Sequence, residues 1–395
     1  MPGIQRTGAL LLLLAAAASC AVADGTAKRQ YLIPFMWHGP NNQINAVKET
    51  LALARVLGRT TVLPDLQSHS FTDAVEENMR FSDLFDMPYM ESSVSALLLG
   101  DLAKHHPSWS GKLDAALLVV PPKQVLVGRL SADLGLTPPP KELWLQSPVT
   151  GWSGCSANQA TSAFVRKSKM LYDMAEAFVR ERLGADQPYV AAHVRPYPDP
   201  CVRIWTEPDT PERAAKMENM CNNEYLMARF VPSIKHLLAA YKSKSVFVMT
   251  HPKVRGVVQE VMRKGGLEPV FMDLADVKPP VGAGGALATN VSFSLLAMVE
   301  EAVCTKAKAF VGTKESSMTG TIIQDRLSHQ LPLADSYSFF RRIGYEDRPI
   351  AIDEFYRLTN WTTMGTDRWR SKLVEKGVNR SAIRGRRLRA ADARL

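Results

Sequence analysis

The chain has 395 residues, 46% hydrophobic and 22% charged, which is enough for one large or two medium globular domains. This composition excludes disordered, collagen-like and disulfide-knot proteins. The net charge is +9, but ten Lys or Arg and two acidic residues from Arg368 onward supply +8 of it (10 − 2). We therefore expect a nearly neutral body, no nucleic-acid partner and a basic, solvated tail over 368–395. Contact of this tail with a polyanion or an anionic membrane surface is the alternative.

The first 23 residues have the pattern of a secretory signal peptide. Arg6 precedes an apolar run over 8–23 that ends in Ala21-Val22-Ala23, a small-x-small cleavage pattern before Asp24. An uncleaved anchor is a rival, although the run is shorter than the roughly 20 residues that span a bilayer. Lipid modification of Cys20 is another. After cleavage no transmembrane segment is expected, so the protein would enter the endoplasmic reticulum or Golgi lumen, or be secreted. The chain carries sequons at Asn290, Asn360 and Asn379.

The cysteines that remain after cleavage are even in number. They are Cys155, Cys201, Cys221 and Cys304. In an oxidising compartment this number predicts two disulfides, with all three pairings open. No CxxC or HxxxH spacing accompanies them, so no metal site is expected.

Apolar β-rich runs alternate with amphipathic segments, which predicts an α/β fold with parallel sheets. Between the first two strands, apolar residues recur every three or four positions from Ile44 to Leu57, as in a helix. The expected strands are 31–37, 60–63, 116–120, 189–194, 245–249, 270–272 and 309–311, and the other expected helices are 163–183, 224–241, 254–264 and 293–303. A Pro-rich irregular segment over 136–156 separates two α/β units.

Polar residues follow three of these strands, where ligands gather in open α/β sheets. The first cluster, 37–43, is rich in Asn and opens a helix, although Asn also serves as a helix cap. In the second, alternation puts His193 and Arg195 on one face at a strand tip, so Arg195 either binds phosphate or pairs with Asp199 for structural reasons. The third, 312–320, supplies hydroxyls that either bind phosphate or only cap a helix.

These blocks resemble the GDP-fucose protein O-fucosyltransferase family. Asn42-Gln43 with 57–64 is similar to the family's "NQ … LNRTLVLP" start, and His193, Arg195 and Asp199 to its H-x-R…D motif. Residues 245–250 resemble its "SVYVAT" strand, and 309–326 its "FIGN…SSF…ER" segment. The four blocks keep the family order over roughly Tyr31 to Tyr345.

The resemblance implies a GT-B architecture, in which two Rossmann-like domains with parallel sheets face each other across a cleft. It also implies inverting, metal-independent transfer of fucose from GDP-fucose to a Ser or Thr hydroxyl of a protein acceptor in the secretory pathway. Arg195 would be catalytic. The donor-binding residues would be Gly39, Asn42, His193, Asp199, His251, Ser316, Ser317 and Met318. No Asp-x-Asp pair occurs in the chain, in line with a reaction that needs no metal or other cofactor.

The expected division of the chain has five parts. These are a signal peptide over 1–23, an N-terminal Rossmann-like domain over 24–160, a C-terminal nucleotide-sugar domain over 161–345, a return segment over 346–367 and the basic tail over 368–395.

Three departures from the family keep other functions open. Gly39-Pro40-Asn41 replaces Arg-Phe-Gly-type residues, His251 stands where the family has Asp, and Met318 replaces Phe. A same-fold glycosyltransferase with another donor, such as a rhamnose nucleotide, or with a glycan acceptor is one alternative. A secreted protein that binds without catalysis is another. Asp199, Asp65 and Glu315 are candidates for the general base, and an oxocarbenium-like route that needs none is the alternative.

Overall fold

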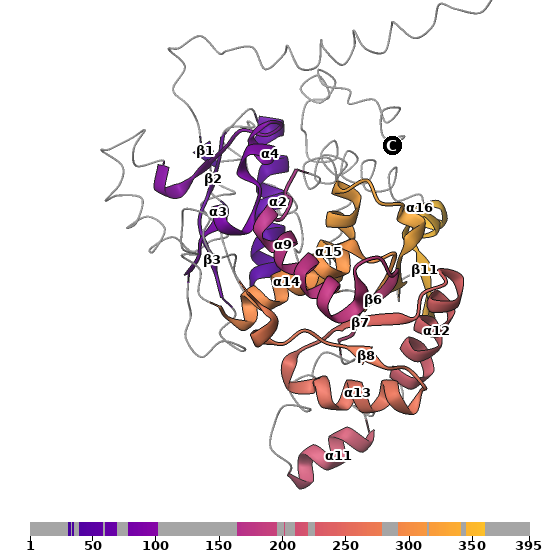
Figure 1. The fold of residues 1–395 in the computed structure, drawn as a ribbon. Coiled ribbons are helices and arrows are strands. Elements are labelled where there is room, and N and C mark those ends of the chain that lie inside the picture. Colours follow the sequence, from indigo (N-terminus) through magenta and orange to yellow (C-terminus); the bar gives the residue numbers. More distant parts are fainter. Residues whose placement is uncertain are drawn as a thin grey trace, which may run out of the picture.

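The computed structural model describes two larger sheets, a two-stranded antiparallel pair and the helices around them (Figure 1). It describes residues 31–32, 34, 39–57, 60–68, 78–101, 164–195, 201, 210–219, 226–278, 291–313, 316–340 and 345–359. The expected strand at 116–120 and the irregular segment at 136–156 lie outside these residues.

The first sheet is parallel and has the strand order β1-β2-β5. Its strands are β1 (Tyr31–Leu32), β2 (Thr60–Leu63) and β5 (Ala96–Leu98). Helix α2 (Pro40–Leu57) connects β1 to β2, which confirms the βαβ opening predicted from the apolar spacing. A small antiparallel pair and two short helices complete this region: β3 (Leu66–Gln67), β4 (Asn78–Met79), α3 (Phe81–Leu84) and α4 (Met87–Glu91).

The second sheet has six strands in the order β11-β10-β9-β6-β7-β8. Neighbouring strands are parallel except β10 and β11, which pair antiparallel. The strands are β6 (Tyr189–His193), β7 (Ser245–Met249), β8 (Pro269–Val270), β9 (Ala309–Gly312), β10 (Ser336–Phe340) and β11 (Tyr345–Ala351). From β6 the chain adds strands on one side through β7 and β8, and then returns to add β9 and β10 on the other. The order therefore reverses between β6 and β9, which makes a topological switch point.

Helices lie around the second sheet, and α11 projects away from the rest of the molecule (Figure 1). The α-helices are α9 (Lys169–Val179), α11 (Pro211–Asn219), α12 (Val231–Ala240), α13 (Arg255–Lys264), α14 (Phe293–Lys306), α15 (Ser317–Ser328) and α16 (Ile352–Thr359). A π-helical turn, Arg180–Gly184, extends α9 and another, Leu226–Phe230, precedes α12. Three 3₁₀ turns span Pro252–Val254, Leu274–Asp276 and Leu333–Asp335.

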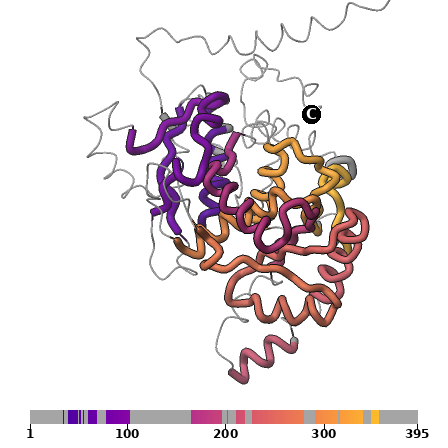
Figure 2. Tube along the Cα trace, viewed as in Figure 1, coloured from indigo at the N-terminus to yellow at the C-terminus, as the bar shows by residue number. Residues whose placement is uncertain are grey.

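One continuous hydrophobic core joins the two sheets. It contains Ile44 of α2, Phe178 of α9, Val299 of α14, Ile322 of α15 and Phe247 of β7, all buried. Helix α2 packs against α15, which comes from a distant part of the chain, so the indigo and orange segments of the trace meet near its centre (Figure 2). A second core cluster fills the other face of the larger sheet, under α12 and α13. The predicted α/β fold with parallel strands is confirmed, whereas two domains facing across a cleft remain a prediction.

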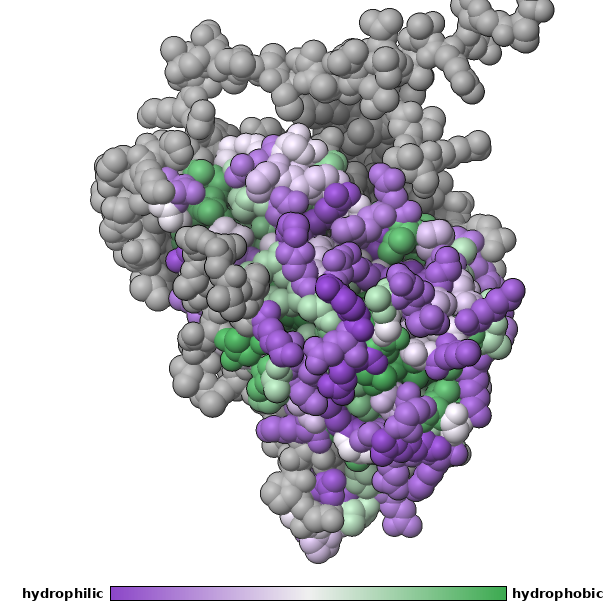
Figure 3. Space-filling view, in the orientation of Figure 1, coloured by the Kyte–Doolittle hydropathy of each residue, from purple (hydrophilic) through white to green (hydrophobic). Residues whose placement is uncertain are grey.

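The described surface is mostly hydrophilic on the face shown in Figure 3, with hydrophobic residues in small separate patches. Among the described residues, the large hydrophobic side chains with high exposure are Met227 and Val291. Within these same ranges, none of the helices has both the length and the apolar character that a membrane crossing requires.

Candidate active site at the strand switch point

The carboxyl ends of β6 and β9 meet at the switch point. His193 is the last residue of β6 and lies opposite Gly312, the last residue of β9. The backbone N–H of Thr313 donates to the His193 carbonyl over 3.0 Å. Two of the three sequence clusters, around His193–Arg195 and Gly312–Ser316, are thus brought together at one edge of the sheet, which is where ligands bind in open α/β sheets.

His193 is buried and electrically neutral at physiological pH. Its side chain is 5% exposed, and its Nδ1 shares a hydrogen bond of 2.8 Å with the Thr319 hydroxyl in the first turn of α15. Burial, aided by the positive charge of Arg195, lowers the pKa of His193 to about 3. Of these two residues, Arg195 is therefore the one that carries a positive charge.

Arg195 is half-buried and its backbone is fixed by Thr313. The Arg195 N–H donates to the Thr313 hydroxyl over 2.8 Å, and this hydroxyl donates to the His193 carbonyl over the same distance. Thr313 thus links the two residues through one side chain. Sequence reasoning did not single out Thr313 or Thr319 for these roles, although both hydroxyls lay within the third cluster.

Gly312 allows α15 to begin close to the sheet. A Cβ at this position would lie 2.3 Å from Thr319 Cγ2 and 2.6 Å from its Oγ1, well inside contact distance. Because the Thr319 hydroxyl holds His193, the missing side chain of Gly312 is needed for the contact between α15 and β6.

The start of α15 has the features of an anion site. Ser316 precedes the helix with extended backbone angles (φ −92°, ψ 127°), is 3% exposed, and its side chain makes no capping hydrogen bond to the described first turn. The alternative that this serine is only a helix cap is therefore not confirmed. Ser317 and Met318 are half-buried, and Met318 packs against the main hydrophobic core. The N–H groups of a first helical turn lack partners within the helix and attract anions.

The end of β7 lies next to this site. Thr250 donates to the Val194 carbonyl over 2.6 Å, and the Val194 N–H donates to the Met249 carbonyl over 2.9 Å. His251 follows, and its Nδ1 accepts from the Lys253 N–H over 3.2 Å at the start of a 3₁₀ turn. The structure therefore places His251 beside the switch point, with one ring nitrogen used locally.

Arg255, at the start of α13 after β7, is the centre of a further cluster of charged side chains. Its guanidinium pairs with Asp273 at 2.5 Å and with Glu300 at 3.0 Å. Burial raises the pKa of Glu300 to about 8, although Arg255 acts in the opposite direction. Sequence reasoning did not identify this group, because its members are far apart in the chain.

The start of α2 holds the first sequence cluster. The Gly39 carbonyl accepts from the N–H groups of Asn42 and Gln43, at 2.9 and 3.3 Å. The Gln43 amide makes two hydrogen bonds with the backbone of Gln67, at 3.0 and 2.8 Å, which anchor α2 to β3. Asn42 is half-buried. Asn41 is 9% exposed, and its Oδ1 has no hydrogen-bond partner among the described residues.

The cysteine expectation needs one correction. Cys201 is buried and disulfide-bonded, but Cys304 is a free thiol in the middle of the core on α14, where burial raises its pKa. The predicted disulfide at Cys304 is therefore wrong. An even cysteine count carries no information on burial, and Cys304 packs as a small hydrophobic residue. The predicted residues Cys155, Cys221, Asp199, Asn290, Asn360 and Asn379 lie outside the described part of the chain.

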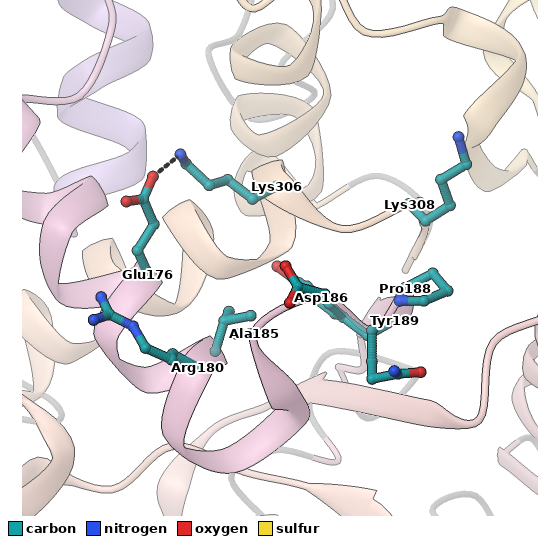
Figure 4. Close-up of a pocket in the computed structure, with 10 residues that line it drawn as sticks. Glu176, Arg180, Ala185, Asp186, Pro188, Tyr189, Lys306 and Lys308 are labelled. Carbon is teal, nitrogen blue, oxygen red and sulfur yellow. Dashed lines mark hydrogen bonds and ion pairs between the residues drawn. The ribbon is translucent and has the colours of Figure 1, made fainter.

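A separate pocket of about 560 Å³ lies at the opposite, amino-terminal edge of β6 and β9. Its wall contains the ion pair Glu176–Lys306, while the Lys308 side chain extends away from the pocket (Figure 4). Its lining mixes both charges and does not contact the switch point. Within the described ranges, no three His, Cys, Asp or Glu side chains gather in a way that could hold a metal ion.

Comparisons with known structures agree with this architecture. A crystal structure of POFUT1 in complex with GDP-fucose aligns with a TM-score of 0.50 and 16% identity, covering 80% of this chain and 99% of that one. A second crystal form of this complex aligns with a TM-score of 0.50 and 15% sequence identity, covering 79% of this chain and 98% of that one. The structure of NodZ alpha-1,6-fucosyltransferase co-crystallized with GDP aligns with a TM-score of 0.43 and 12% sequence identity, covering 80% of this chain and 96% of that one. This similarity is too remote to carry an argument. No protein-family model matches the sequence, and no curated protein matches it. The chain thus has a fucosyltransferase-like fold.

Proposed function

We propose that this chain is an inverting, metal-independent glycosyltransferase that moves fucose from GDP-fucose to a hydroxyl group of a protein. The observation that carries the proposal is the Arg195 site: a half-buried arginine whose backbone N–H is held by Thr313, at the switch point of a fucosyltransferase-like fold where α15 begins. The POFUT1 structures hold GDP-fucose or GDP, which supports a guanosine nucleotide as the donor here.

The chemistry requires positive charge at the leaving group. As the acceptor oxygen bonds to the anomeric carbon, the bond from that carbon to the β-phosphate oxygen breaks, and the departing diphosphate gains negative charge. Arg195 can bind this group through two N–H donors, and the first turn of α15 adds further donors. Preorganised donors of this kind each lower a barrier by several kcal/mol. Because these groups supply the charge, the proposed reaction needs no metal ion.

The acceptor proton needs a base or solvent. Asp65 is the weakest of the three candidates, because its carboxylate accepts from the Phe81 N–H over 2.9 Å and so caps the start of α3. Asp199 and Glu315 lie outside the described residues. With the sequence signal for secretion, we propose a Ser or Thr on a protein of the secretory pathway as the acceptor.

A different nucleotide sugar is the second candidate, and His251 favours it. The resemblance expects an acidic residue after this strand, but His251 presents an imidazole whose Nδ1 accepts from the Lys253 N–H. An acidic side chain and a neutral imidazole differ in hydrogen-bonding capacity, so they favour different bases.

The donor can be identified by thermal unfolding of the full chain, purified from a secretory host, with GDP, GDP-fucose, UDP or UDP-rhamnose. A ligand at 100 times its Kd stabilises the native state by about 2.7 kcal/mol. We expect stabilisation by GDP and GDP-fucose that is equal in EDTA and in Mn²⁺. A response only to uridine nucleotides would support the second candidate, and stabilisation that EDTA abolishes would refute metal independence. No response to any of the four would contradict both glycosyltransferase proposals.

A further inference from the structure

A cluster of charged side chains is buried between helix α2 and the second sheet, away from the switch point. It consists of Lys48, Lys167, Glu301 and Asp325, which we call the buried charge cluster. Each is at most 2% exposed. Lys48 lies on α2, Lys167 just before α9, Glu301 on α14 and Asp325 on α15, and these helices converge at the centre of Figure 1.

Lys167 makes the direct contacts between members of the cluster. Lys167 Nζ lies 2.9 Å from a carboxylate oxygen of Glu301 and also forms an ion pair with Asp325. Lys48 Nζ donates to Gln324 Oε1 over 2.7 Å, which joins residues 276 positions apart in the chain. Two cations thus face two anions, so the cluster is balanced in charge.

The electrostatics tie Lys48 to this cluster. Burial lowers the pKa of Lys48 to about 8, while Asp325 and Glu301 act against that shift. Burial would also lower the pKa of Lys167, but Asp325 and Glu301 outweigh it and raise that pKa. Removing one member therefore leaves a buried charge without its counter-charge.

Such clusters add little to the stability of a protein, because a protein with well-packed apolar residues of similar volume in their place is often equally stable. Their best-attested role is to fix one register of packing, since each partner is satisfied in a single arrangement. Here the register is that of α2 on α15. The first turn of α2 carries Asn41 and Asn42, while α15 begins at the Arg195 site, so the cluster links the two parts of the candidate site.

Helix α2 is fixed on both sides. Gln43 binds the Gln67 backbone in the first region, and Lys48 binds Gln324 of α15. We propose that Lys48 is a positioning residue for the glycosyl transfer inferred above, and this inference rests on that proposed function. Lys48 holds the Asn41–Asn42 turn at a fixed place relative to the Arg195 site. It is no proton donor to substrate, since it is 1% exposed and bonded to Gln324.

The test is Lys48→Met, which keeps the length of the stem and removes the charge. Its matched control is Lys169→Met, a lysine whose side chain is 87% exposed and pairs only with Asp173 on its own helix among the described residues. Hydrogen exchange of the full chain is the first measurement. We expect Lys48→Met to lose about 10-fold or more protection across α2, with β6 and β9 unchanged, and Lys169→Met to match the wild type.

Binding and turnover are measured on the same proteins. We expect GDP affinity to stay within about 3-fold of the wild type, because the Arg195 site is intact, while kcat falls by about 10-fold or more. The double variant Lys48→Met/Gln324→Met tests the role further. It should recover part of the thermal stability, because an apolar pair replaces the lost Lys48–Gln324 contact while the charge imbalance of the cluster remains, but it should not recover kcat. Recovery of both would show a merely structural role and overturn the proposal.

A milder variant, Gln324→Ala, covers the case in which Lys48→Met does not fold. It should also lose hydrogen-exchange protection across α2 and have a lower kcat, with smaller changes in both. Unchanged protection of α2 in the variants that fold would overturn the inference whether or not the protein transfers fucose. If the wild type neither binds GDP nor transfers a sugar, the proposed function has failed. Lost α2 protection would then still show that Lys48 fixes the register, without a catalytic consequence.

Discussion

The substitution Gly312→Ala tests the packing that creates the candidate site. The new Cβ would lie 2.3 Å from Thr319 Cγ2, 2.6 Å from Thr319 Oγ1 and 3.0 Å from Thr319 Cβ. Thr319 is 2% exposed and cannot turn into solvent, so α15 or β9 must shift. Overpacking of this kind costs about 1–3 kcal/mol. Loss of the His193–Thr319 hydrogen bond adds about 0.5–1.5 kcal/mol, for a total of about 1.5–4.5 kcal/mol.

The assay is equilibrium urea unfolding, followed by GDP titration of the folded variant. Gly256→Ala is the matched control, because Gly256 lies in α13 with nothing within 4 Å of an added Cβ. It should stabilise the chain by up to about 1 kcal/mol through helix propensity. Gly312→Ala/Thr319→Ala should recover part of the lost stability. A Gly312→Ala protein as stable as the wild type, with unchanged GDP affinity, would refute this account of the site.

Three further outcomes follow from the same contacts. Thr313→Val should cost about 1–3 kcal/mol in urea unfolding, because it leaves the Arg195 N–H without its acceptor, whereas Thr313→Ser should cost less. His193 binds its proton only near pH 3 when folded but near 6.5 when unfolded, so its contribution to stability is full above pH 6.5 and is lost as pH falls toward 3. The wild type should therefore lose up to about 1.4 kcal/mol per pH unit in this window relative to His193→Gln, and parallel pH profiles would contradict a neutral buried His193. Cys304 should react with a thiol reagent only after unfolding, and Cys304→Ala should keep the Cys201 disulfide in non-reducing mass spectrometry; rapid native labelling of Cys304 would contradict its burial.

The sequence predicted the elements whose signal is local. The strands at 60–63 and 245–249 and the helix start at 293 agree with the structure, because apolar β-branched runs and a Ser292 cap define them without distant partners. The predicted 163–183 helix begins later, at Lys169, since Lys167 before it is held in the buried charge cluster.

Other features depend on partners far along the chain. Helix α14 continues to Lys306, three residues beyond the predicted end. Arg326 of α15 donates to the carbonyls of Cys304, Thr305 and Ala307 there and satisfies the helix end. Strands β10 and β11 were not predicted either. Ser336 and Ser338 of β10 are polar yet buried, which hides the hydrophobic pattern of a core strand.

Part of the candidate site was predictable, because its signal in the sequence is local. Alternation and strand position identified His193, Arg195 and the 312–320 segment, which the structure brings together. The hydroxyl links through Thr313 and Thr319 require the spatial order of the strands. The buried charge cluster is the hardest case, since a Lys or Asp on a helix is most often solvated and only tertiary structure shows it buried.

The central claim is that Arg195 binds the diphosphate of a guanosine nucleotide, and GDP affinity measured by calorimetry in EDTA tests it most directly. Loss of a charge-assisted, two-donor contact is worth about 1.5–3 kcal/mol, so Arg195→Ala should bind GDP about 10- to 100-fold more weakly than the wild type. Arg263→Ala, which removes an exposed arginine that lies in the last turn of α13 and pairs with Glu268, should bind GDP normally. Equal GDP affinity of the wild type and a folded Arg195→Ala protein, or no GDP binding by the wild type, would contradict the account.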